Sequence, residues 1–272
     1  MKLSVVIPAH NEEGCIGETI TTLYHRLHTG NIDHEIVVIN DNSKDKTVAI
    51  LTELAHTVPT LKFFTNNGLH GFGYAVRYGL ERFTGDCVAV FMADMSDSPE
   101  DLVRFYRVMV SENYDCVFGS RWIKGAIVID YPQPKKFLNR LVNNLISWSF
   151  GLRYNDLTNA FKLYKRGTIQ GLKPFLSPHF NLTLELSLKS IVRNYSYTYL
   201  PNSWQNRKTG ESKLKIREMG SRYFFIYLYC LIEKFFSRGD FAKVTHLKQS
   251  NAENSGEIRS ELSGSISSAS NG

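Results

Sequence analysis

The stretch 90–100, VFMADMSDSPE, takes the chain from an apolar run into a cluster of carboxylates. The preceding DCVAV has the composition of a buried strand, and the following DLVRFYRVMV has the spacing of a helix. Asp94 and Asp97 can therefore hold a metal ion and a phosphate at the carboxyl edge of a sheet. They can equally cap the helix, because Asp and Ser accept hydrogen bonds from its free N–H groups and Pro99 suits its first turn. The rest of the chain decides between these interpretations.

Short apolar runs alternate with helical periods along the first 120 residues. The predicted strands lie at 3–8, 35–40, 61–65, 87–93 and 116–119. The predicted helices lie near 13–27, 45–56, 73–83 and 99–111. This alternation predicts an α/β fold with a mostly parallel sheet flanked by helices. Ligands of such sheets bind beyond the carboxyl ends of the strands, where this chain carries PAHNEE, NDNS, NNGLHGFG and MADMSDSPE.

The later part of the chain contains amphipathic segments. A helix at 137–148 carries a stripe of apolar side chains opposite a polar face of Asn139, Arg140, Asn143 and Asn144. A further helix is predicted at 180–194 and a strand at 195–201. Residues 222–236 predict a short aromatic-rich helix broken by Glu233 and Lys234.

Three parts of the chain differ in composition. The α/β pattern occupies residues 1–215, and C-terminal amphipathic character continues over 216–242. From 243 to 272 the chain is rich in Ser, Asn and Gly, which predicts a disordered tail. We therefore expect one main domain, an interfacial helix and a tail.

Charge and cysteine content narrow the functional classes. The 272 residues carry a net charge of +6, which suits nucleic acid, a membrane surface or a phosphorylated substrate. The four cysteines form no CxxC pair, which favours a reduced intracellular protein and disfavours zinc. The N-terminal apolar run is cut by Pro8, so no signal peptide is expected. No stretch reaches the roughly 18–20 apolar residues that a spanning helix needs.

The glycines argue against a dinucleotide-binding fold. Such a fold has GxGxxG directly after its first strand, whereas this chain has PAHNEE there. Its glycine loop, GLHGFG, follows the third predicted strand instead. Gly71 and Gly73 can face a phosphate or simply lead into a helix, and the sequence leaves both alternatives open.

The loops taken together resemble a known family. VVIPAHNEE, EIVVINDNSKDKT, the glycine loop and VAVFMADMSDSPEDL resemble, in order, the motifs of family 2 glycosyltransferases with the GT-A fold. VFGSRWIKG, NDLTNAFKLYKR, FNLTLELSLKS and SWQNRKTGESKL resemble the dolichol-phosphate mannose synthase branch and its bacterial polyprenyl-phosphate relatives. The resemblance covers about residues 1–215. It implies a nucleotide-diphosphate sugar donor, either GDP-mannose or a UDP-sugar, and Mg²⁺ or Mn²⁺ as cofactor.

The metal motif of the family departs from its usual form here. The resemblance places Asp-x-Asp at 92–94, but Met92 occupies the first position. A thioether is a poor ligand for a hard cation, whereas Mg²⁺ commonly uses one or two carboxylates plus substrate phosphates. We therefore expect Asp94 to bind the metal, with Ser96 and Asp97 as further candidates. A helix cap is the simpler interpretation of Asp97.

The resemblance also assigns residues to the donor. It implies that Pro8, His10 and Glu12 pack on the base and ribose, and that Asp41 recognises the base beside Asn40, where a second acid is usual. Gly71 belongs to the glycine loop of the donor site. Arg121 is expected near the donor phosphates, with a surface salt bridge as the alternative.

The acceptor decides the mechanism. A hydroxyl acceptor needs a general base, but the segment 183–186 offers only Glu185, which could be a base or an anchor of the fold. A phosphate acceptor needs cations instead, and RKTGESKLKIR offers Arg207 and Lys213 among others. We therefore expect an inverting transfer of a hexose, with mannose favoured, to polyprenyl monophosphate. The alternatives are transfer to a glycan hydroxyl, or a non-catalytic nucleotide-sugar-binding protein, which only Met92 suggests.

A polyprenyl phosphate lies in a membrane, so the chain must reach one. The helices at 137–148 and 223–236 have apolar surfaces, and Lys213, Lys215, Arg217 and Arg222 precede the second. Such helices bind the interface of anionic bilayers, although both could instead pack on the sheet or form a dimer. We expect a peripheral protein on the cytoplasmic face of a membrane that binds no nucleic acid. A homo-oligomer is compatible with the sequence.

Overall fold

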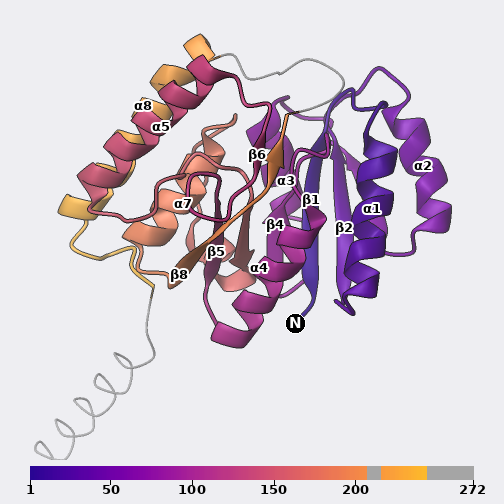
Figure 1. The fold of residues 1–272 in the computed structure, drawn as a ribbon, viewed down its shortest axis with the longest axis horizontal. Coiled ribbons are helices and arrows are strands. Elements are labelled where there is room, and N and C mark those ends of the chain that lie inside the picture. Colours follow the sequence, from indigo (N-terminus) through magenta and orange to yellow (C-terminus); the bar gives the residue numbers. More distant parts are fainter. Residues whose placement is uncertain (207–215, 244–272) are drawn as a thin grey trace, which may run out of the picture.

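A seven-stranded sheet forms the centre of the protein (Figure 1). The structure is a computed structural model that describes residues 1–206 and 216–243. In spatial order, the strands are β3 (Leu61–Thr65), β2 (His34–Asn40), β1 (Leu3–Ala9), β4 (Cys87–Val90), β7 (Lys162–Lys165), β5 (Cys116–Ser120) and β8 (Tyr197–Pro201). The pairs are parallel except those of β7, which runs antiparallel to both β4 and β5. β6 (Val128–Ile129) and β9 (Trp204–Gln205) form a separate parallel pair.

Helices cover both faces of the sheet because strand side chains alternate between them. Val5 and Ile7 of β1 join one core, and Val6 joins the other. The first core is completed by α1 (Ile16–Thr29), α2 (Thr47–Thr57) and α4 (Pro99–Glu112). The second is completed by α3 (Phe72–Leu80), α5 (Gln133–Phe150), α6 (Arg166–Gly171), α7 (Leu182–Val192) and α8 (Ile216–Phe236). The predicted α/β architecture is therefore confirmed.

Two predictions about individual elements were wrong. Within the described residues, three strands (β6, β7 and β9) and one helix (α6) were not predicted. The strand predicted at 87–93 leaves the ladder after Val90, so residues 91–93 already belong to the loop above the sheet. The helix predicted to break at Glu233 and Lys234 runs unbroken to Phe236. β7 was not predicted, because KLYK is short and contains two lysines.

Glu233 does not break α8 because it has a buried partner. Its carboxylate accepts hydrogen bonds from Arg193 Nε at 2.6 Å and Arg193 Nη2 at 3.0 Å. This pair joins α8 to the end of α7, its main neighbour among the helices. The predicted tail falls outside the described residues from 244 onward, and the division between 1–215 and 216–242 stays a prediction.

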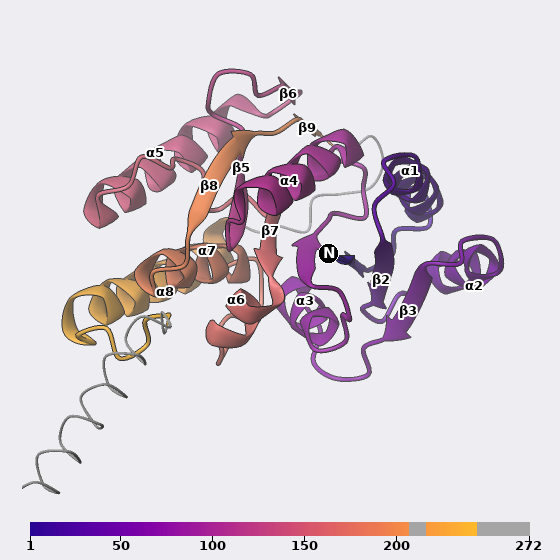
Figure 2. The same cartoon turned by 90° about the horizontal axis from the view of Figure 1, so that it is seen from below.

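α5 turns two of its predicted polar residues, Asn139 and Asn143, toward the protein, whereas Arg140 and Asn144 are exposed. Asn143 is fully buried, whereas Phe137 and Trp148 are 72% and 83% exposed. Leu138, Leu141 and Leu145 of the apolar stripe are also exposed. Figures 1 and 2 place α5 and α8 at the same end of the molecule, away from α1 and α2. Among the helices in residues 1–206 and 216–243, none is long and apolar enough to span a membrane.

Candidate active site

A cavity of about 1040 Å³ opens beyond the carboxyl ends of the parallel strands. It brings together nine of the predicted site residues: Pro8, His10, Glu12, Asp41, Gly71, Asp94, Ser96, Asp97 and Arg121. Pro8 lies near the carboxyl end of β1 itself, and the other eight come from the loops that follow β1, β2, β3, β4 and β5, as expected where parallel strands end at one edge. The predicted acceptor residues Arg207 and Lys213 lie outside the described residues.

Asp41 organises the side of the cavity next to β2. Its carboxylate is buried and accepts hydrogen bonds from Asn66 Nδ2 at 2.9 Å and from the Gly71 N–H at 2.8 Å. His70 Nδ1 lies 3.5 Å from the same carboxylate. The backbone carbonyl of Asp41 contacts His10 Nδ1 at 2.6 Å. Asp41 therefore connects the loops that follow β1, β2 and β3, the last of which is the glycine loop.

Gly71, the N-cap of α3, and Gly73, in its first turn, allow a close contact with the backbone at 178–179. A Cβ on Gly73 would lie 2.5 Å from the carbonyl carbon of Pro178 and 2.6 Å from the His179 nitrogen. Gly71 has a φ of +138°, where an L side chain is strained, and its N–H is donated to Asp41. The structure thus gives these glycines a packing role, although Gly71 also lines the cavity.

The loop after β4 directs two carboxylates into the cavity. Met95 has a left-handed φ of +58°, and the Ser96 N–H donates to Asp94 Oδ1 at 3.1 Å. Asp97 is only 3% exposed. Burial, together with the negative charge of Asp94, raises the pKa of Asp97 to about 7.

The expected helix-cap role of Asp97 is not what the structure shows. The N-cap residue of α4 is Ser98, and no side chain caps this helix by a hydrogen bond. Asp97 Oδ2 instead has no hydrogen-bond partner among the described residues. A buried carboxylate oxygen without a hydrogen-bond partner, in the same loop as Asp94, fits a hard divalent cation. The acidic loop is therefore compatible with the expected Mg²⁺ or Mn²⁺.

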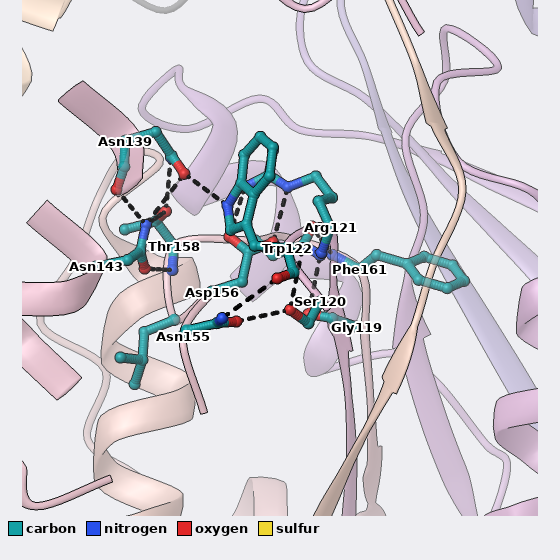
Figure 3. A network of polar contacts seen from close by, with 12 residues as sticks. Gly119, Ser120, Arg121, Trp122, Asn139, Asn143, Asn155, Asp156, Thr158 and Phe161 are labelled. Atoms are coloured by element: carbon teal, nitrogen blue, oxygen red, sulfur yellow. Dashed lines mark hydrogen bonds and ion pairs between the residues drawn. The ribbon is translucent and has the colours of Figure 1, made fainter. Parts of the chain in front are cut away.

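Arg121 forms a buried salt bridge, not the surface one that was its alternative (Figure 3). Its Nε and Nη2 donate to the two oxygens of Asp156 at 2.8 and 2.7 Å. Burial by itself lowers the pKa of Arg121, but the facing carboxylate raises it above its ordinary value. Asp156 was missed as a site residue, although it lies in the quoted segment NDLTNAFKLYKR.

A polar network attaches α5 to the loop that follows β5 (Figure 3). Trp122 Nε1 donates to Asn139 Oδ1 at 3.1 Å. Asn139 Nδ2 and Asn143 Nδ2 donate to Thr158 Oγ1 at 3.1 and 2.9 Å. These bonds explain how Asn143 can be buried and Asn139 half-buried, since unpaired amides there would be costly. Much of the apolar stripe is consequently left exposed, and part of it lines the cavity.

The end of the cavity away from Asp41 and Asp94 is apolar. It lies between α5 and α8 and is lined there by Leu138, Val142, Leu145, Tyr223, Phe224 and Tyr227. Lys135 and Arg222 also line the cavity. Lys135 was not predicted to belong to the site, and no sequence signal singled it out. Arg222 had been assigned only to the basic flank of a membrane helix.

Glu185 is an anchor of the fold. It is fully buried and accepts hydrogen bonds from the N–H groups of Leu176 and Ser177 at 2.8 and 2.7 Å. Lys189 Nζ lies 2.6 Å from the same carboxylate. Its oxygens are therefore engaged within the protein, and Glu185 is not among the residues that line the cavity.

Residues 4–191 match the model of a protein family described as glycosyl transferase family 2. The chain therefore belongs to this family, and its fold is the GT-A glycosyltransferase fold. It is 28% identical to the dolichol-phosphate mannosyltransferase of Pyrococcus furiosus, over 79% of this chain and 60% of that protein. It is also 28% identical to the polyprenol monophosphomannose synthase of Mycolicibacterium smegmatis, over 77% of this chain and 80% of that protein. The chain thus spans less than two thirds of the length of the Pyrococcus relative.

Solved structures share the same fold. Glucosyl-3-phosphoglycerate synthase from Mycobacterium tuberculosis, in complex with Mn²⁺, UDP and phosphoglyceric acid, aligns with a TM-score of 0.63. The alignment covers 86% of this chain and 78% of that one, at 17% identity. At this identity the likeness establishes the architecture alone.

Proposed function

We propose that this protein is an inverting glycosyltransferase that moves a hexose, with mannose favoured, from a nucleotide-diphosphate sugar to a polyprenyl monophosphate. The single observation that carries the proposal is the composition of the cavity. One end contains Asp41 and Asp94 at the strand ends, and the other lies between apolar side chains of α5 and α8. A polar donor and an amphiphilic acceptor fit these two ends. The names of the Pyrococcus and Mycolicibacterium relatives support the same acceptor class.

The position of Glu185 favours a phosphate over a hydroxyl acceptor. A hydroxyl must lose its proton during attack, whereas a phosphate monoester is already an anion. Glu185, the acid expected at the family's base position, is bound to two backbone N–H groups and Lys189. Lys135 and Arg222 supply positive charge along the cavity, where an anionic acceptor would lie.

The reaction follows as a direct displacement. An acceptor phosphate oxygen forms a bond to the anomeric carbon while the bond between that carbon and the nucleoside diphosphate breaks. The electron pair leaves with the diphosphate, and the configuration at the carbon inverts. Asp94 would hold Mg²⁺ or Mn²⁺, which neutralises charge on the departing diphosphate. Asp41 and its contacts would fix the nucleoside end of the donor.

The outer face of α5 and the exposed aromatic side of α8 would rest on the membrane that contains the acceptor. Phe224, Phe225, Phe235 and Phe236 of α8 are exposed, as are Phe137 and Trp148 of α5. Aromatic and aliphatic side chains of this kind lie in the interface of a bilayer. The protein would bind peripherally, with the cavity facing the lipid headgroups.

The proposal is tested with the full chain, Mn²⁺ and labelled GDP-mannose or UDP-glucose in detergent micelles. Dolichyl phosphate and undecaprenyl phosphate are offered as acceptors, beside the same alcohols without phosphate. We expect labelled lipid only with the phosphates, and an inverted anomeric linkage by NMR. Asp94→Asn should lower turnover at least about a hundredfold, whereas Glu100→Gln, an exposed acid in the first turn of α4, should not.

Two results would contradict the proposal. Transfer to a glycan hydroxyl without any lipid phosphate would favour the other enzyme class. Donor binding without turnover on either acceptor would favour a non-catalytic nucleotide-sugar-binding protein.

A further inference from the structure

The acidic loop after β4 has methionine, Met92, where the family motif has its first aspartate. It has a further aspartate, Asp97, three residues after Asp94. Met92 lines the cavity at the position where the family motif has its first acid. Its thioether is a soft, weak ligand for Mg²⁺ or Mn²⁺. Asp97 lines the same cavity as Asp94, on the far side of the turn at Met95.

We propose that Asp97 is the second carboxylate of the metal site and replaces the acid that is missing at Met92. The inference rests on the proposed function in one respect, namely that a divalent cation meets the donor diphosphate at Asp94. It assigns a role to a residue that the Asp-x-Asp pattern does not contain.

The hydrogen bonding of Asp97 carries the proposal. The residue is 3% exposed, and its Oδ2 has no hydrogen-bond partner within the described residues. A buried carboxylate oxygen without a donor is costly, and proteins tolerate such groups mainly where a ligand completes them. Asp97 does not cap α4, whose N-cap is Ser98, and the side-chain hydrogen bonds of Arg121 go to Asp156. The Met92 N–H and the charge of Arg121 interact with the Asp97 carboxylate but leave Oδ2 without a donor.

The backbone holds Asp97 in place from the opposite side. Asp97 forms an isolated bridge with Trp204, and the Gln205 N–H donates to the Ser96 carbonyl at 3.0 Å. The loop is therefore attached to β9 as well as to β4. In the described residues, no cluster of three or more His, Cys, Asp or Glu side chains could hold a metal by itself. Two carboxylates completed by the oxygens of a diphosphate are the usual arrangement for Mg²⁺.

The experiment measures Mn²⁺ binding to the full chain by electron paramagnetic resonance, with and without GDP or UDP. Four proteins are compared: wild type, Asp97→Asn, Met92→Asp, and the double variant Asp97→Asn/Met92→Asp. We expect Asp97→Asn to weaken Mn²⁺ binding about tenfold or more, since even residues that only support a ligand cost that much. The double variant should recover most of this loss. Glu100→Gln is the control and should bind Mn²⁺ like wild type, and thermal melting verifies that each variant is folded.

Each outcome either supports or overturns the inference. A folded Asp97→Asn protein that binds Mn²⁺ with wild-type affinity overturns it, as does a double variant that recovers nothing. A wild-type protein that binds no Mn²⁺ even with GDP or UDP also overturns it. Mn²⁺ binding that depends on Asp97, in a chain that glycosylates no lipid phosphate, would leave this inference standing and reject the proposed function. If the chain glycosylates lipid phosphate and Asp97→Asn binds Mn²⁺ with unchanged affinity, the proposed function stands and this inference is rejected.

Discussion

Arg121 and Asp156 form a buried two-point ion pair in the wall of the cavity. Nε and Nη2 of Arg121 lie 2.8 and 2.7 Å from the carboxylate, and the Arg121 backbone N–H donates to it at 2.9 Å. The guanidinium of Arg121 was expected to face the donor phosphates, but its Nε and Nη2 donate hydrogen bonds to Asp156. Its structural task is to join the loop after β5 to the segment before β7.

We expect Asp156→Asn to destabilise the protein by about 3–5 kcal/mol, because it leaves the charge of Arg121 buried without its partner. Urea unfolding followed by circular dichroism measures the change. Asp130→Asn, which alters an exposed acid, serves as the control. Equal unfolding midpoints for Asp156→Asn and wild type would show that the pair does not hold these loops together.

Asp41→Asn should raise the dissociation constant of the donor roughly ten- to a hundredfold, because a charged hydrogen-bond acceptor is worth about 1.5–3 kcal/mol. Turnover at saturating donor should change much less, since binding of the base contributes equally to ground and transition states. Isothermal titration with GDP and UDP measures the affinity.

In the same titration, Asn66→Ala distinguishes two roles of Asp41, namely binding the base of the donor and holding the glycine loop in place. It removes a hydrogen bond to Asp41 while keeping the carboxylate, so its effect on donor affinity should be smaller. If Asn66→Ala weakens the donor as much as Asp41→Asn does, Asp41 acts only by holding the glycine loop.

The two faces of α5 should respond in opposite ways to substitution. Trp148→Ser on the exposed face should weaken binding to anionic vesicles and leave the unfolding midpoint unchanged. Asn143→Leu on the buried face should lower the midpoint, because it removes the bond to Thr158 and leaves polar partners unsatisfied. Vesicle sedimentation and thermal melting measure the two effects.

A surface-exposed apolar residue elsewhere provides the control. Val110→Asn changes an exposed position of α4, in the helix layer on the opposite face of the sheet. It should leave vesicle binding intact. Trp148→Ser protein that still sedimented like wild type would assign the apolar face of α5 to another role, such as contact with a second copy of the chain.

Glu35 should contribute to stability against acid. Burial alone raises its pKa, but hydrogen bonds from Ser4, Thr84 and Lys62 together lower it from 4.5 to about 2. A lowered pKa in the folded state means that the stabilisation is present above pH 4.5 and is lost as the pH falls through about 2. Glu35→Gln should therefore cost on the order of 2–3 kcal/mol at pH 7.

Unfolding curves between pH 7 and pH 2 test this prediction. The difference between Glu35→Gln and wild type should shrink toward the acid end of the series. Glu53→Gln, an exposed acid on α2, should follow wild type throughout. A difference that stays constant with pH would mean that the glutamate acts through packing and not through its charge.

Much of the fold was predictable because local pattern and tertiary environment agree there. The apolar runs that became β1, β2 and β5 are buried on both faces, as their composition indicated. β7 could not be predicted, because its four residues acquire their strand conformation only by pairing with β4 and β5. Those partners lie more than forty residues away in sequence, so the local pattern contains no trace of the pairing.

By itself, the sequence determined the family, the α/β alternation and the set of polar loops at the strand ends. These depend on residue type and spacing along the chain. Only the tertiary structure decided that Arg121 pairs with Asp156, that Glu185 is an anchor, and that α5 buries Asn143. The physical reason is that an amphipathic pattern defines two faces, whereas the hydrogen-bond partners available inside the fold decide which face is buried.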